Sequence, residues 1–226
     1  KPSSSDNPDH HEITYHYSQT GFEVKCPLIL VPGILGTALE KFKFVNGIKI
    51  TDKDVWPRFA KYFLDDFNVL IPDMAGHGDT GFDPSWDYSG PAQASRLTKM
   101  LDQLGITKAH VIGNSMGGFI AAQFARLFPQ RTITAALIDP IGVTSPQLSD
   151  MERLLEKGRN VFQVQNRGEF DEFFAMTMAN PPWFPDFILE AVSVKYQERR
   201  EQLAKIFEGY HLQDLLDDSL EDIRKP

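Results

Sequence analysis

One short run of residues has the types and spacing of a nucleophilic serine site: Gly113-Asn114-Ser115-Met116-Gly117. It follows the apolar residues 110–112 and opens an amphipathic stretch, so the serine would sit on a tight turn between a strand and a helix. Such a turn crowds the positions two residues either side, and glycines 113 and 117 relieve that crowding. The bare pattern also arises by chance in glycine-containing turns, but the flanking strand and helix favour catalysis. We therefore expect Ser115 to be the catalytic nucleophile.

A second run could supply part of an oxyanion hole: Val31-Pro32-Gly33-Ile34-Leu35-Gly36. Acyl transfer needs two backbone N–H groups aimed at the developing oxyanion. One donor is expected from Met116, the residue after the nucleophile, and the other from the loop after the first buried strand, best at Ile34. The alternative interpretation is a turn that only ends the strand, in which Pro32-Gly33 would fit equally well. Only the combination with Ser115 indicates an oxyanion hole.

The elements that must position these residues alternate between strands and helices. Apolar runs predict buried strands at residues 28–31, 69–71, 110–113 and 133–138, and a polar edge hairpin at 12–17 and 22–25. Helical spacing predicts helices at 56–66, 92–104 and 116–128. This order is typical of an α/β fold: a doubly wound, mostly parallel sheet with helices on both faces.

The pattern changes after Pro146, where helices are predicted one after another with no strand between them. They cover residues 151–157, 169–178, 185–207 and 212–220, in a stretch with 16 acidic and 10 basic residues. A helical cap inserted on the sheet domain is favoured over a separate domain, because its apolar faces need a surface to cover. The expected organisation is a polar leader (1–11), a core (12–145), a cap (146–220) and a lead-in to a further core segment (221–226).

Five segments resemble segments of the α/β-hydrolase superfamily. The resemblance extends from about Pro27 to the end of the chain. The chain looks most like the capped lipases and esterases of the monoacylglycerol lipase and ABHD6-like type. The segments are Trp56-Pro57-Arg58-Phe59-Ala60, Pro72-Asp73-Met74-Ala75-Gly76-His77-Gly78-Asp79, the run around Ser115, Asp139-Pro140-Ile141-Gly142 and Pro181-Pro182-Trp183-Phe184-Pro185.

Two features depart from this family pattern near the oxyanion loop. Pro32-Gly33 stands where relatives usually have His-Gly, and resembles the lecithin–cholesterol acyltransferase branch. The segment 37–55, with Asn46-Gly47 as a hairpin turn, is longer than the family norm and is expected to form a flap.

The acid and base of the triad are a third departure. The resemblance implies the order Ser, then Asp or Glu, then His, with the last two following two more strands beyond the cap. We therefore expect them outside this sequence, and expect the C-terminal part of the fold to be missing. Asp139 and His211 have the right order for an internal triad, but the resemblance makes Asp139 a loop anchor and His211 an ordinary cap residue.

The cap is rich in aromatic residues, which suggests a wall for an acyl chain. The expected lining is Phe173, Phe174, Met176, Trp183 and Phe184. A helix cannot bury all of these against one neighbour, so some should face the cleft. The alternative is that they only hold the cap to the sheet.

Composition narrows the class of protein. A net charge of −8 argues against a nucleic-acid partner, and Cys26 as the single cysteine excludes a disulfide framework. No metal or cofactor is expected, because no ligand spacing or phosphate loop accompanies the histidines and glycines. No apolar run reaches the roughly 20 residues of a membrane span, although peripheral lipid contact stays open. The sequence determines neither the compartment nor the oligomeric state. We expect the chain as given to be soluble. If an N-terminal segment has been removed, an extracytoplasmic or membrane-associated location is also open.

These features together predict a serine hydrolase that cleaves carboxylic esters with medium or long acyl chains through an acyl-enzyme on Ser115. The alternatives are a carbon–carbon bond hydrolase or an acyltransferase of the same fold, and a non-enzymatic relative without a complete triad.

Overall fold

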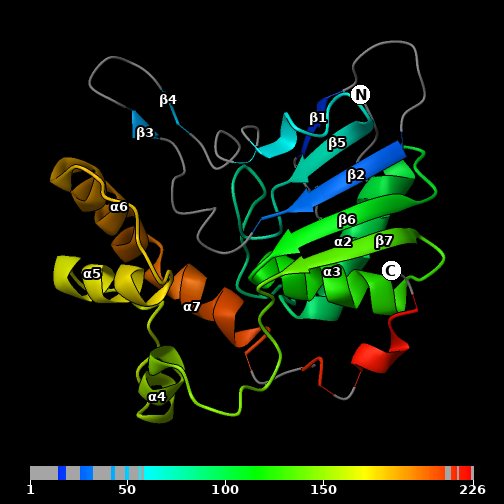
Figure 1. Cartoon of the computed structure of the whole chain (residues 1–226). Helices are drawn as coiled ribbons and strands as arrows, with labels where there is room; N and C mark the ends of the chain where they lie inside the picture. The colour runs from blue at the N-terminus through cyan, green and yellow to red at the C-terminus, as the bar shows by residue number, and fades with distance from the viewer. Residues whose placement is uncertain are drawn as a thin grey trace.

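The computed structural model describes residues 15–18, 26–32, 42–43, 49–50, 56, 59–211, 215–217 and 219–224. Among these residues one five-stranded sheet has the order β1-β5-β2-β6-β7 (Figure 1). Its strands are β1 (Tyr15–Ser18), β2 (Cys26–Val31), β5 (Phe67–Pro72), β6 (Ala109–Asn114) and β7 (Thr132–Ile138). β5, β2, β6 and β7 are parallel to one another, and β1 pairs antiparallel with β5. The predicted α/β fold with a mostly parallel sheet is confirmed.

The sheet is covered on both faces because its strands alternate between two apolar clusters. Ile29 and Val31 of β2 pack into the cluster that includes α2 (Gly90–Gln103) and α3 (Met116–Leu127). Leu28 and Leu30 face the other side, against the segment around Ala60. Side chains of a strand point alternately to opposite faces, so a strand buried on both reads as one apolar run.

The segment on that second face is less helical than its spacing predicts. Trp56, Phe59 and Ala60 have helical geometry, but residues 61–66 form turns. The Tyr62 and Phe63 N–H groups bond the carbonyls three residues back, at 3.2 and 2.9 Å. The predicted helix over 56–66 is therefore wrong in its second half, where hydrogen-bonded turns replace it.

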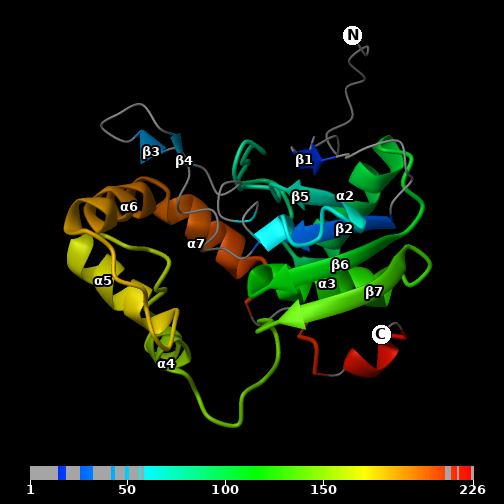
Figure 2. The same cartoon turned by 45° about the horizontal axis from the view of Figure 1, so that its top comes forward.

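Four helices follow β7 without an intervening strand: α4 (Asp150–Glu156), α5 (Arg167–Met176), α6 (Asp186–Glu198) and α7 (Arg200–Glu208). They lie beyond the carboxyl edge of the sheet, with α5 and α6 farthest out and α7 reaching back toward that edge (Figure 2). The single helix predicted over 185–207 is wrong, because the chain breaks at Arg199 (φ −104°, ψ 7°). The Arg199 guanidinium donates to the Gly76 carbonyl oxygen at 2.9 Å, which ties this break to the core.

The remaining predicted elements have mixed outcomes. Residue 216 is a bend and residues 217 and 219 are turns, ahead of a 3-10 turn, η2 (Leu220–Asp222), so the helix predicted over 212–220 is wrong there. β3 (Phe42–Lys43) and β4 (Lys49–Ile50) pair antiparallel around the predicted hairpin turn. The turn at Asn46-Gly47, the leader 1–11 and residues 22–25 lie outside the described residues.

Candidate active site

Ser115 is held in a strained turn between β6 and α3. Its backbone has φ 55° and ψ −119°, a conformation that side chains rarely adopt. A Cβ at Gly113 would collide with the Gly117 carbonyl oxygen, and a Cβ at Gly117 would collide with the Val31 carbonyl oxygen. The Ser115 N–H donates to the Ile138 carbonyl oxygen at 2.9 Å. Only glycine fits at positions 113 and 117, as the sequence predicted.

The N-terminus of α3 gives this turn an electropositive side. Met116 is the first residue of α3 and is buried. The first N–H groups of a helix have no partner within the helix, and its dipole favours negative charge there. Val31 pairs with Gly113, so the chain leaves β2 beside the turn. Ile34 lies outside the described residues, and its amide stays a prediction.

A cavity of about 780 Å³ opens between this turn and the segment from α4 to α7, which we call the cap. Its core side is formed by Trp56, Asn114, Ser115, Met116, Asp139 and Ile141. Of the residues predicted to line an acyl pocket, Phe173, Phe174, Met176 and Phe184 border it. Trp183 does not; its side chain is 84% exposed.

On the cap side, five further aromatic residues border the cavity and were not among the predicted lining residues. They are Phe162, Phe170, Tyr196, Phe207 and Tyr210. Val192, which also borders it, precedes Tyr196 by four residues on α6, the spacing of one helix face. That periodicity was a usable signal for α6, whereas Phe207 and Tyr210 depend on how α7 docks.

The two internal triad candidates differ in their relation to the cavity. Asp139 follows β7 with φ 41° and borders the cavity with Ser115. His211 is not among the residues that border it, and its ring stacks on Phe207 with centroids 4.7 Å apart. Burial lowers the pKa of His211, and the nearby Glu152 carboxylate opposes that shift.

The loop after β5 contains a buried histidine, His77, whose ring is held by a backbone hydrogen bond. His77 is 1% exposed, and its Nδ1–H donates to the Ala75 carbonyl oxygen at 3.1 Å. Burial, with a smaller contribution from the Arg199 charge, lowers the pKa of His77 to about 3, so the ring is neutral. The Gly76 carbonyl oxygen accepts from Gln202 Nε2 at 2.6 Å as well as from Arg199. This loop therefore anchors the cap.

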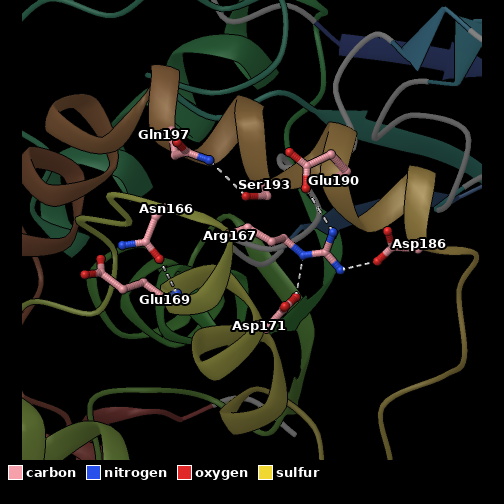
Figure 3. Close-up of polar contacts among 8 residues, drawn as sticks. All are labelled: Asn166, Arg167, Glu169, Asp171, Asp186, Glu190, Ser193 and Gln197. Atoms are coloured by element: carbon pink, nitrogen blue, oxygen red, sulfur yellow. Dashed lines mark hydrogen bonds and ion pairs between the residues drawn. The ribbon is translucent and has the colours of Figure 1, made fainter.

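The two outer cap helices are tied together by one arginine (Figure 3). The Arg167 guanidinium on α5 contacts Asp171 at 2.7 Å on its own helix. It also contacts Asp186 at 2.8 Å and Glu190 at 3.0 Å on α6. Three carboxylates thus share one cation on the outside of the cap.

The described residues hold no group of three or more His, Cys, Asp or Glu side chains that could bind a metal ion. Within the same part of the chain, the longest helix, α2, has 14 residues, and no helix is long and apolar enough to cross a bilayer.

Comparison with known proteins places this chain in a family. A family model for the alpha/beta hydrolase fold matches residues 27–212. Lipase 1 of Psychrobacter immobilis is 27% identical over 193 residues, which cover 85% of this chain and 56% of that lipase. Lipase 3 of Moraxella sp. (strain TA144) is 27% identical over 226 residues, covering 94% of this chain and 68% of that lipase.

A solved structure agrees with these relatives. The crystal structure of a membrane phospholipase A, described as a bacterial virulence factor, is similar with a TM-score of 0.76 and 26% identity. The match covers 95% of this chain and 68% of that one. This chain thus spans between about half and two thirds of the lengths of the lipases it matches. The predicted resemblance is confirmed: the chain belongs to the α/β-hydrolase fold family.

Proposed function

We propose that this chain carries the nucleophile and the acyl-binding part of a serine hydrolase that cleaves carboxylic esters with medium or long acyl chains. The observation that carries the proposal is the backbone of Ser115, whose positive φ is maintained between two positions that admit only glycine. Such strain persists where the surrounding structure maintains it, and it is typical of functional sites. The similarity to lipases supports an ester as substrate.

In this mechanism the Ser115 Oγ attacks the ester carbonyl carbon, and a general base takes the hydroxyl proton. The amides of Met116 and Ile34 donate to the tetrahedral oxyanion. The alcohol leaves with that proton, and water then attacks the acyl-enzyme to release the acid and regenerate the serine. His211 is not the base in this proposal, because it does not border the cavity.

The cavity supports an apolar acyl chain because aromatic and methionine side chains form most of its cap side. Pockets of this kind gain affinity from apolar burial, while a few polar groups fix the orientation of the ligand. Phe173, Phe174, Met176 and Phe184 are the predicted lining residues that support this assignment.

Labelling with a fluorophosphonate probe tests the nucleophile. The full-length polypeptide should gain one adduct by intact mass, and Ser115→Ala should gain none. Ser95→Ala, on the exterior helix α2, is a matched control that keeps labelling. Full-length protein that resists labelling would exclude the serine hydrolase and leave a non-enzymatic relative of the same fold.

A further inference from the structure

Eight aromatic rings form an unbroken series along the cap side of the cavity. In order they are Phe184, Phe174, Phe170, Tyr196, Phe173, Phe162, Phe207 and Tyr210. Successive ring centroids lie 4.6 to 6.2 Å apart, and all eight residues border the cavity. Rings at these separations are in contact and hold one another in place. We call this series the aromatic wall.

One end of the aromatic wall packs on α3, the helix that begins directly after Ser115. The ring of Tyr210 packs on that of Phe119, with centroids 6.4 Å apart. Phe119 belongs to the first turn of α3, and its N–H donates to the Ser115 carbonyl oxygen at 3.1 Å. The Tyr210 end is thus the inner end of the wall.

Burial distinguishes the other end. Phe162 and Phe207 are at most 7% exposed, whereas Phe174 and Phe184 are only half-buried. Pro182, beside Phe184, is exposed and also borders the cavity. The series therefore runs from the helix that follows Ser115 to the half-buried rings near the exposed Pro182.

We propose that the acyl chain of the substrate lies along the aromatic wall with its carbonyl at Ser115, and that Phe174 and Phe184 determine selectivity for long chains. A short acyl group ends before these outer rings. The distal carbons of a long chain reach them and gain apolar contact there, since each buried methylene group is stabilising. This assignment deepens the proposed ester hydrolase and depends on it for the position of the carbonyl.

Ester hydrolysis by the full-length enzyme tests the order along the wall. The substrates are monomeric p-nitrophenyl butyrate and tetradecanoate. Phe174→Ala and Phe184→Ala should each lower kcat/KM for the tetradecanoate about tenfold, which is the effect of losing one or two methylene contacts in an apolar pocket. Butyrate hydrolysis should change by less than about twofold, because the short chain does not reach those rings.

Two exposed aromatic residues of the same region are matched controls. Trp183 and Phe187 are 84% and 62% exposed and do not border the cavity. Trp183→Ala and Phe187→Ala should leave both substrates unchanged. The proposal is overturned if Phe174→Ala and Phe184→Ala lower butyrate hydrolysis as much as tetradecanoate hydrolysis, or if Trp183→Ala reproduces their effect.

A binding measurement separates this inference from the proposed function. Displacement of Nile red by methyl tetradecanoate and methyl butyrate needs no catalytic base. If the wild type hydrolyses no ester but Phe174→Ala weakens tetradecanoate binding about tenfold, the proposed reaction fails, while the assignment of Phe174 to the distal part of a long acyl chain stands. If hydrolysis proceeds and neither outer variant changes chain-length preference, the reaction stands and the wall assignment fails.

Discussion

Replacing Ser115 with glycine should stabilise the protein relative to replacing it with alanine. Alanine keeps the Cβ in a backbone conformation with φ 55° and ψ −119°, while glycine adopts it freely. Strain of this kind costs on the order of 1–3 kcal/mol. Relief of this strain by glycine is partly offset, by about 0.4–1 kcal/mol, because glycine makes the unfolded chain more flexible. We expect Ser115→Gly to exceed Ser115→Ala by about 1–2 kcal/mol in the free energy of unfolding.

Urea denaturation and thermal melting of the two variants measure this difference. For a chain of this size the melting temperatures should differ by roughly 2–8 °C. The hydroxyl is absent from both variants, so the comparison isolates the backbone term. At Ser95 in α2, where φ is negative, the same pair should reverse in order, with glycine about 1 kcal/mol less stable than alanine. Equal stability at position 115, or the same order at both positions, would refute the strain argument.

Three further outcomes follow from the loop after β5 and from the cap. Gly78→Ala should lower the free energy of unfolding by more than Gly105→Ala. Both glycines have positive φ, but only at Gly78 would the new Cβ collide with the Asp73 carboxyl group. Equal losses in urea unfolding would contradict this. His77 is neutral when folded and binds a proton when unfolded below about pH 6.5, so its contribution to stability falls by about 2 kcal/mol from pH 7 to pH 5. His77→Gln should remove that part of the pH dependence in unfolding curves, and unchanged slopes would argue against a buried neutral ring. Arg167→Met should lower the melting temperature, and the loss should shrink in 1 M NaCl because salt screens exposed ion pairs; a loss independent of salt would contradict this.

The parts of this fold that depend on local pattern were predicted closely from the sequence. β6 and α3 lie within one residue of their expected bounds, because an apolar run, a glycine-flanked turn and an amphipathic stretch are each encoded locally. The glycines around Ser115 were identified for the same reason, since the crowding they relieve comes from the turn itself.

Long-range contacts account for what the sequence did not reveal. The break between α6 and α7 at Arg199 accompanies a hydrogen bond to Gly76, more than a hundred residues earlier in the chain. The helix expected after residue 212 gives way near Leu216, whose N–H donates to the Gly142 carbonyl oxygen at 2.7 Å. Neither partner is visible in the local pattern. Likewise, apolar character alone could not separate Phe184, which borders the cavity, from the exposed Trp183.

The position of β2 in the middle of the sheet has a consequence for how the protein forms during synthesis. β2 emerges early from the ribosome, but its two partners, β5 and β6, both come later in the chain. Its apolar side chains stay exposed to solvent until those strands are synthesised. Exposed apolar surface of this kind makes a nascent chain prone to aggregate. The pairing of Val31 with Gly113 is also what brings the end of β2 to the serine turn. The serine turn therefore forms only after β6 has been synthesised, and a ribosome stalled before β6 would hold a chain with an unpaired β2 and no serine turn.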